Sequence, residues 1–309
     1  MGGLKPLAMT MLLLSGVAAS AQPTPTPQMQ VVRRPMQVPP VRVEGTCTIV
    51  PMRPSPAAPV VEVTINGRGP YRFLVETGAQ GHGRINAAVA EAIGLTRVGE
   101  VRAPGPGGTT TTRPVWGVDR LAIGAMTFRD VQLIASPVIP GAPADIDGML
   151  GIDLFRQLIL AIDFGNRVAS FRTGRLEGGV EADFASGLAA IPIDIAGRSF
   201  RVHVDTGNAA APLFLLEEEA RSLALAGPPV ERGRARTSFG EFALMEAPLA
   251  VPVTVGGAVL PVHSVSWPAA RGIGNLGSPG LAGMLVEIDR QGGRVAIRPS
   301  AAPPACPSG

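Results

Sequence analysis

Hydrophobic and polar residues alternate along two stretches of the chain, and each stretch leads to an acidic residue. In the first stretch, residues 61–65 alternate, Asn66-Gly67 follows, and an apolar run over 73–75 comes next. Alternation with a period of two is typical of half-buried strands, and Asn-Gly is typical of a tight hairpin turn. The pattern therefore predicts a β-hairpin whose second strand ends at Glu76.

The same order of features returns in the second half of the chain. Residues 191–195 alternate, Gly197 marks a turn, and residues 200–204 form a largely apolar run before Asp205. A short helix is expected after each hairpin, over 87–93 and over 216–223, from the cap residues and apolar spacing there. A repeat of this length indicates duplicated domains and not a solenoid of short units.

The predicted organisation has five parts. They are a leader, a spacer, two similar lobes and a tail, over residues 1–21, 22–58, 59–176, 187–299 and 300–309. A length of 309 residues agrees with about two domains. The 39 glycines and 31 prolines favour turns over long helices. We expect an all-β protein with two lobes facing each other across a cleft and few short helices.

The leader has the features of a secretory signal peptide. Lys5 supplies a positive charge, the stretch over 7–17 is apolar, and Ala19-Ser20-Ala21 matches a cleavage site. A transmembrane anchor is the alternative, but it needs about 20 apolar residues. We expect a periplasmic or secreted protein without a stable membrane span after cleavage. The spacer is rich in proline, which favours extended conformations, and we expect it to pack no core.

Charge and histidine content argue against two classes of function. The formal net charge is +3, Lys5 is the only lysine, and the one local arginine cluster, over 232–236, has no interleaved aromatic residues. Nucleic-acid binding requires a basic stripe or patch, so we expect no nucleic-acid partner. The three histidines lack the spacing of metal ligands, and we expect no metal and no cofactor.

The two cysteines, Cys47 and Cys306, lie near the two ends of the mature chain. In an exported protein such a pair raises the possibility of a disulfide, which would tie the ends together. Two free thiols are the alternative.

Both apolar strands end in an acidic residue followed by Thr-Gly. Two carboxyls held close together cannot both ionise, so one can accept a proton from water while the other polarises a carbonyl. Threonine can fix a loop by hydrogen bonds, and glycine lets two loops approach closely. The candidate catalytic residues are Glu76 and Asp205, and the candidate supporting residues are Thr77, Gly78, Thr206 and Gly207.

These motifs resemble those of bacterial retropepsin-like aspartic proteases, duplicated here into two pepsin-like lobes. The resemblance is carried by residues 73–79, 147–153 and 203–207. It implies an aspartic endopeptidase that hydrolyses a bound peptide or protein through water activated by Glu76 and Asp205. It also implies that Met149-Leu150-Gly151 lies on a strand behind the catalytic loop. Because both lobes are in one chain, we expect a monomer.

The sequence departs from the family pattern at three positions of the expected site. Glu76 is one methylene longer than the usual aspartate, and Asn208 and Asn275 replace small or apolar residues. A displacement near 1 Å can cost a catalytic group about a hundredfold in rate. Two functions therefore stay open, an active endopeptidase and a catalytically inactive peptide- or protein-binding module of the cell envelope.

A glycine-rich stretch containing Gly107 and Gly108 lies where the first lobe would carry a substrate-binding flap. An ordinary surface loop is the alternative. His203, two positions before Asp205, shares its strand face, and it is a candidate either for tuning the acidic pair or for simple packing.

Overall fold

The computed structural model describes residues 36–53, 58–104, 110–136, 145–237, 240–268, 274–303 and 305–306. This part of the chain consists mainly of strands and has only two short α-helices, α1 (Ala87–Ala92) and α2 (Glu217–Arg221). The predicted all-β fold class is confirmed. Helix α1 begins at Asn86, whose side chain accepts a hydrogen bond of 2.9 Å from the backbone N–H of Ala88, as expected of a capping residue.

The first half of the chain forms an eight-stranded sheet with the order β1-β8-β5-β9-β4-β3-β7-β6. Its strands are β1 (Arg42–Glu44), β3 (Val60–Ile65), β4 (Arg68–Glu76), β5 (Gly83–Asn86), β6 (Thr96–Pro104), β7 (Thr110–Ile123), β8 (Met126–Ser136) and β9 (Gly148–Gly151). The predicted hairpin is β3–β4, and its inward side chains join a hydrophobic core that contains Phe73, Phe128 and Leu150.

The second half forms a nine-stranded sheet with the order β16-β17-β20-β15-β21-β14-β13-β18-β19. Its strands are β13 (Ala190–Ile195), β14 (Arg198–Asp205), β15 (Leu213–Phe214), β16 (Val230–Thr237), β17 (Gly240–Pro248), β18 (Val253–Val255), β19 (Ala258–Val259), β20 (Ser264–Pro268) and β21 (Gly274–Gly277). Side chains of this sheet, among them Val202, Trp267 and Leu276, form part of a second hydrophobic core.

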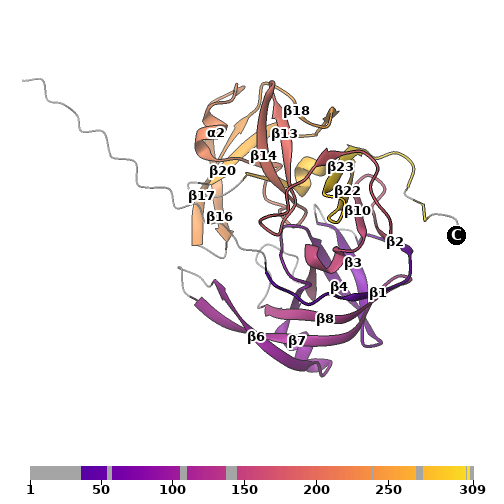
Figure 1. Cartoon of the computed structure of the whole chain (residues 1–309). Helices are drawn as coiled ribbons and strands as arrows, with labels where there is room; N and C mark the ends of the chain where they lie inside the picture. The colour runs from indigo at the N-terminus through magenta and orange to yellow at the C-terminus, as the bar shows by residue number, and fades with distance from the viewer. Residues whose placement is uncertain are drawn as a thin grey trace, which may run out of the picture.

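A six-stranded sheet joins the two halves, with the order β12-β23-β22-β10-β11-β2. Its strands are β2 (Cys47–Pro51), β10 (Ile159–Asp163), β11 (Val168–Arg172), β12 (Val180–Glu181), β22 (Met284–Asp289) and β23 (Arg294–Pro299). Strand β10 from the first half pairs antiparallel with β22 from the second, so backbone hydrogen bonds connect the halves directly. Figure 1 shows this sheet on the right, the sheet of the second half at the upper left and the sheet of the first half along the bottom.

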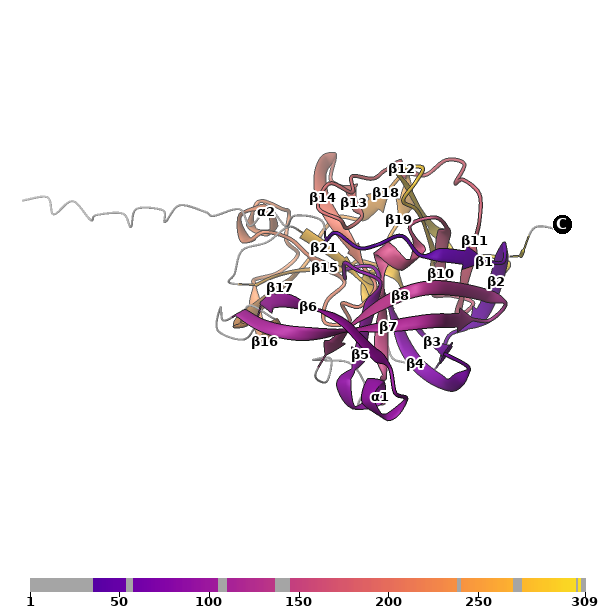
Figure 2. The ribbon, with the colours of Figure 1, turned by 60° about the horizontal axis from the view of Figure 1, so that its bottom comes forward.

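Two long hairpins, β6–β7 and β16–β17, extend from the two larger sheets. Both views place them on the same side of the molecule, away from the C-terminus (Figures 1 and 2). Residues 105–109, which separate β6 from β7 in the sequence, are outside the described residues, so the predicted flap glycines Gly107 and Gly108 are not located.

The prediction that residues 22–58 pack no core is wrong for the end of that segment. Strand β1 pairs with β8, strand β2 pairs with β11, and Val41, Val50 and Met52 are buried. The prolines in this region flank the two strands or end them, so they leave the pairing edges free. The predicted leader, 1–21, lies outside the described residues and stays a prediction. Within the described chain, no helix has the length and hydrophobicity needed to cross a membrane.

The structure joins Cys47, on β2, to Cys306 near the C-terminus by a disulfide. The bond closes a loop of 259 residues and holds β2 at the edge of the sheet that connects the halves.

We expect the double variant Cys47→Ser/Cys306→Ser to fold but to lose about 2–5 kcal/mol of unfolding free energy, because a cross-link over a long loop restricts the unfolded chain. Urea unfolding of the oxidised wild type and of the variant measures the loss. A reductant should lower the wild-type midpoint and leave the variant unchanged. Equal midpoints for wild type and variant would contradict the expectation.

Candidate active site

The two acidic residues end the central strands of the two larger sheets. Strand β4 ends at Glu76 and pairs in parallel with β9, while β14 ends at Asp205 and pairs in parallel with β21. The prediction that Met149-Leu150-Gly151 lies on a strand beside the first acidic loop is confirmed. Parallel pairing ends at the acidic residue in both sheets, so both carboxyls project from equivalent positions.

Thr77 and Thr206 exchange hydrogen bonds across the boundary between the two loops, and both side chains are fully buried. The Thr77 hydroxyl donates to the carbonyl of Val204 at 2.7 Å and accepts from the N–H of Thr206 at 3.0 Å. The Thr206 hydroxyl donates to the carbonyl of Val75 at 2.6 Å and accepts from the N–H of Thr77 at 3.1 Å. Two hydroxyls thus satisfy four buried backbone groups and fix one loop against the other.

The glycines of both motifs make room for the opposite carboxyl. A Cβ atom at Gly207 would overlap the carboxyl of Glu76, and one at Gly78 would overlap the carboxyl of Asp205. The φ angle of neither glycine lies in the left-handed region, so the requirement here is space and not an unusual backbone conformation.

The longer side chain of Glu76 is accommodated by bonds to both loops. Its Oε1 accepts from the N–H of Gly78 at 2.8 Å, and the carboxyl also hydrogen-bonds to the backbone of Gly207 and to Asp205. Burial raises the pKa of Glu76 well above its ordinary value, and the charge of Asp205 and the bond to Asp205 raise it further. The N–H groups of Gly78 and Gly207 oppose this rise.

Asp205 is surrounded by two asparagines. Its Oδ1 accepts from the backbone N–H of Asn208 at 3.2 Å, and its Oδ2 accepts from the side-chain amide of Asn275. The Asn208 amide donates in turn to the Asn275 Oδ1 at 2.8 Å. Sequence reasoning noticed both asparagines only as departures from a family pattern. The position of Asn208 directly after Gly207 was the available signal, whereas the place of Asn275 opposite His203 follows only from the parallel pairing of β14 with β21.

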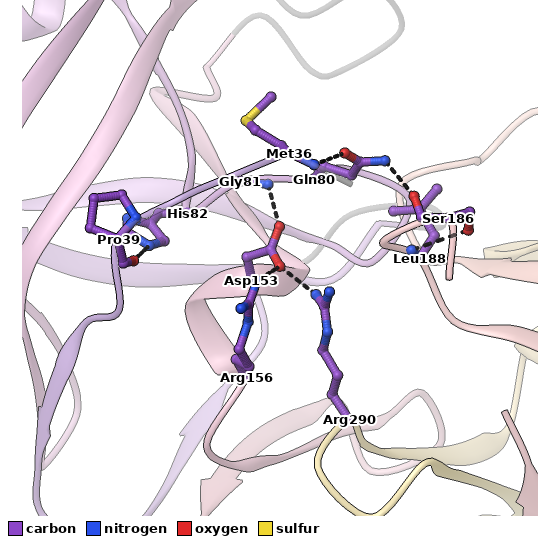
Figure 3. A network of polar contacts seen from close by, with 10 residues as sticks. All are labelled: Met36, Pro39, Gln80, Gly81, His82, Asp153, Arg156, Ser186, Leu188 and Arg290. Carbon is purple, nitrogen blue, oxygen red and sulfur yellow. Dashed lines mark hydrogen bonds and ion pairs between the residues drawn. The ribbon is translucent and has the colours of Figure 1, made fainter. Parts of the chain in front are cut away.

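The loop after Glu76 is held by hydrogen bonds that involve residues of both halves of the chain (Figure 3). The Asp153 carboxylate accepts from the N–H of Gly81 at 2.7 Å and from Arg156 at 2.8 Å, and it also binds Arg290. Gln80 donates to the Ser186 carbonyl at 2.6 Å. Asp153 is therefore a buried residue with a structural role.

The N-terminal arm before β1 crosses the same loop (Figure 3). The N–H of Met36 donates to Gln80 at 2.8 Å, and the His82 Nε2 lies 2.9 Å from the Pro39 carbonyl. The His82 Nδ1 accepts from the N–H of Gln132 at 3.0 Å, so Nε2 carries the proton. Burial lowers the pKa of His82 and favours this neutral form.

His203 is half-buried on the strand face that leads to Asp205, and its Nε2 lies 3.1 Å from the Ser186 hydroxyl. Among the described residues, no three His, Cys, Asp or Glu side chains form a possible metal-binding group. The site therefore consists of two carboxyls in contact, two threonines that exchange hydrogen bonds, two closely packed glycines and two asparagines.

A family model matches part of the first half of the chain. Residues 61–154 match the family model described as aspartyl protease, which covers the hairpin, the Glu76 motif and the Met149-Leu150-Gly151 strand. No curated protein matches the chain significantly. The match supports an aspartyl protease family and hence a hydrolase that acts on peptides.

The reciprocal hydrogen bonds of Thr77 and Thr206 can be tested by substitution. We expect Thr77→Val and Thr206→Val each to lower the unfolding free energy by about 2–5 kcal/mol, because each leaves a buried N–H and a buried C=O without a partner. Thr77→Ser and Thr206→Ser keep the hydroxyl and serve as matched controls with smaller losses. Chemical unfolding measures all four, and equal losses for valine and serine would show that the hydroxyls are not needed.

Proposed function

We propose that the protein is an aspartic endopeptidase whose catalytic residues are Glu76 and Asp205. The observation that carries the proposal is the contact of two carboxyls at the ends of two central strands, held there by the reciprocal bonds of Thr77 and Thr206. The aspartyl protease match over residues 61–154 supports it independently.

The pair suits water-mediated hydrolysis of a peptide bond. One carboxylate accepts a proton from water as the water oxygen attacks the scissile carbonyl carbon, and the other carboxyl donates its proton to the carbonyl oxygen. Collapse of the tetrahedral intermediate breaks the C–N bond. The carboxyl that took the proton of the water gives it to the leaving nitrogen, and the other carboxylate takes a proton back from a hydroxyl of the intermediate. The raised pKa of Glu76 supports a pair that holds one proton over part of the acidic range.

We further propose that the chain is an internal duplication with lobes over 59–176 and 187–299. The order β8-β5-β9-β4-β3-β7 in the first sheet corresponds to β20-β15-β21-β14-β13-β18 in the second. In this proposal an extended peptide binds between the hairpins β6–β7 and β16–β17, and a monomer suffices because one chain supplies both carboxyls. Export to the periplasm or the medium, with cleavage after Ala21, completes the proposal.

The extra methylene of Glu76 is compatible with activity because the carboxyl still meets Asp205. The side chain uses its length to reach the space left by Gly207 while Oε1 stays bonded to Gly78. The loop backbone keeps the reciprocal threonine bonds.

We expect purified residues 22–309 to cleave an unfolded protein at acidic pH with a bell-shaped profile. Glu76→Gln and Asp205→Asn should each lower kcat/KM by at least about a hundredfold, since each removes a proton-transfer group. Glu76→Asp, which keeps a carboxyl, is the matched variant. If the folded wild type cleaves nothing and Glu76→Asp cleaves, the protein is a peptide-binding module instead.

The raised pKa of Glu76 also predicts a pH-dependent stability change. Below its ordinary value of 4.5 the carboxyl is protonated in both folded and unfolded chains, so Glu76→Gln should leave stability unchanged there. Above that value only the folded carboxyl keeps its proton, which costs folding free energy. Glu76→Gln should therefore be more stable than wild type near pH 7. Urea unfolding at pH 4 and pH 7 measures this, and an equal difference at both values would contradict it.

A further inference from the structure

We infer that Asn275, oriented by Asn208, is a positioning residue that holds Asp205 as the ionised member of the pair, so that the shared proton resides on Glu76. This inference rests on the proposed function and assigns the separate roles of the two carboxyls.

A chain of hydrogen bonds with a forced direction leads to Asp205. It begins at the backbone N–H of Ala210, which can only donate and which binds the Asn208 Oδ1 at 2.9 Å. The Asn208 amide nitrogen must then point away from Ala210, and it donates to the Asn275 Oδ1 at 2.8 Å. The Asn275 amide nitrogen is left to face the Asp205 Oδ2. An amide NH₂ group only donates, so the Asp205 oxygen it meets is an acceptor.

The other oxygen of Asp205 also faces a group that can only donate a hydrogen bond. The backbone N–H of Asn208 lies 3.2 Å from Oδ1. Both bonds are stronger to the ionised form, because they are then charge-assisted, whereas the hydroxyl oxygen of a protonated carboxyl is a poorer acceptor. Each oxygen keeps a second lone pair, which leaves Asp205 able to accept a proton from Glu76 or from water.

The corresponding positions beside Glu76 are apolar. In the β4–β9 pair Leu74 is opposite Met149, where the β14–β21 pair has His203 opposite Asn275. Ala79 follows Glu76 by three positions, as Asn208 follows Asp205. Leu74, Ala79 and Met149 pack together and are 4%, 7% and 4% exposed. These side chains add no donor to the backbone N–H groups of Gly78 and Gly207 that Glu76 already has, so burial outweighs those two bonds and this side favours a neutral carboxyl.

The ionisable neighbours of the pair agree with this assignment. The charge that acts on Glu76 is that of Asp205, and together with burial it keeps the pKa of Glu76 raised. On β14, His203 faces the Ser186 hydroxyl. Asp205 is therefore the group that accepts the proton of the attacking water, and Glu76 donates its proton to the carbonyl oxygen of the peptide.

Because one carboxyl belongs to a glutamate and the other to an aspartate, NMR can show which of them carries the shared proton without a measurement of activity. Selective ¹³C labelling of glutamate Cδ and aspartate Cγ gives each carboxyl its own NMR signal, and Glu76→Gln and Asp205→Asn assign the two signals. The wild type should show two coupled steps, with the larger part of the Asp205 change in the lower step and of the Glu76 change in the upper one. The reverse order would overturn the inference.

Replacement of Asn275 tests the positioning role. We expect Asn275→Leu to move the lower step upward by about one pH unit, because a charge-assisted hydrogen bond is lost. Asn208→Ala should move it in the same direction by less, since it only frees the orientation of Asn275. Met149→Leu, at the corresponding position beside Glu76, is the control and should not move it.

The same variants separate this inference from the proposed function. If the protein is a peptidase, the acid limb of the kcat/KM profile should shift with the lower step in Asn275→Leu, while the basic limb stays close to its wild-type position. An unchanged NMR titration in both Asn275→Leu and Asn208→Ala overturns the positioning role, whatever the activity. The expected titrations without any proteolysis would leave the inference standing and reject the peptidase. Circular dichroism checks that each variant is folded.

Discussion

The reciprocal hydrogen bonds of Thr77 and Thr206 are the interaction on which the rest of the site depends. Each hydroxyl lies in one half of the chain and satisfies backbone groups of the other half. Neither acidic loop can complete its buried hydrogen bonds alone, because unpaired groups at this depth are costly. The six-stranded sheet and the bond between Asp153 and Arg290 hold the halves in the arrangement that this exchange requires.

Space is the second constraint, and it explains how a glutamate fits where an aspartate was expected. The carboxyl of Glu76 lies against Gly207, where any Cβ atom would overlap it. Its extra length is taken up by bonds to Gly78 and Gly207, so the contact with Asp205 is kept. The two threonines therefore draw the loops together, and the two glycines leave room for the carboxyls between them.

Much of the fold and of the pair could be predicted because the signals are local. Alternation and a turn at Asn66-Gly67 specify the first hairpin, and Thr-Gly after an acidic residue marks each loop. The role of residues 41–52 could not be predicted, because β2 pairs with β11 far along the chain and its flanking prolines suggested a spacer. The bonds between Asn208 and Asn275 were hidden for the same reason, since only parallel pairing of distant strands brings them together.

The two halves differ in the side chains at corresponding positions beside the carboxyls. Corresponding positions beside the carboxyls hold Leu74, Ala79 and Met149 in one half and polar residues in the other. In the proposed catalytic pair, two identical surroundings would leave a shared proton equally stable on either carboxyl. Burial outweighs the backbone donors at Glu76, whereas Asp205 also receives a side-chain amide from Asn275, and this difference removes the degeneracy. A single chain can carry such a difference, whereas two identical chains related by symmetry cannot.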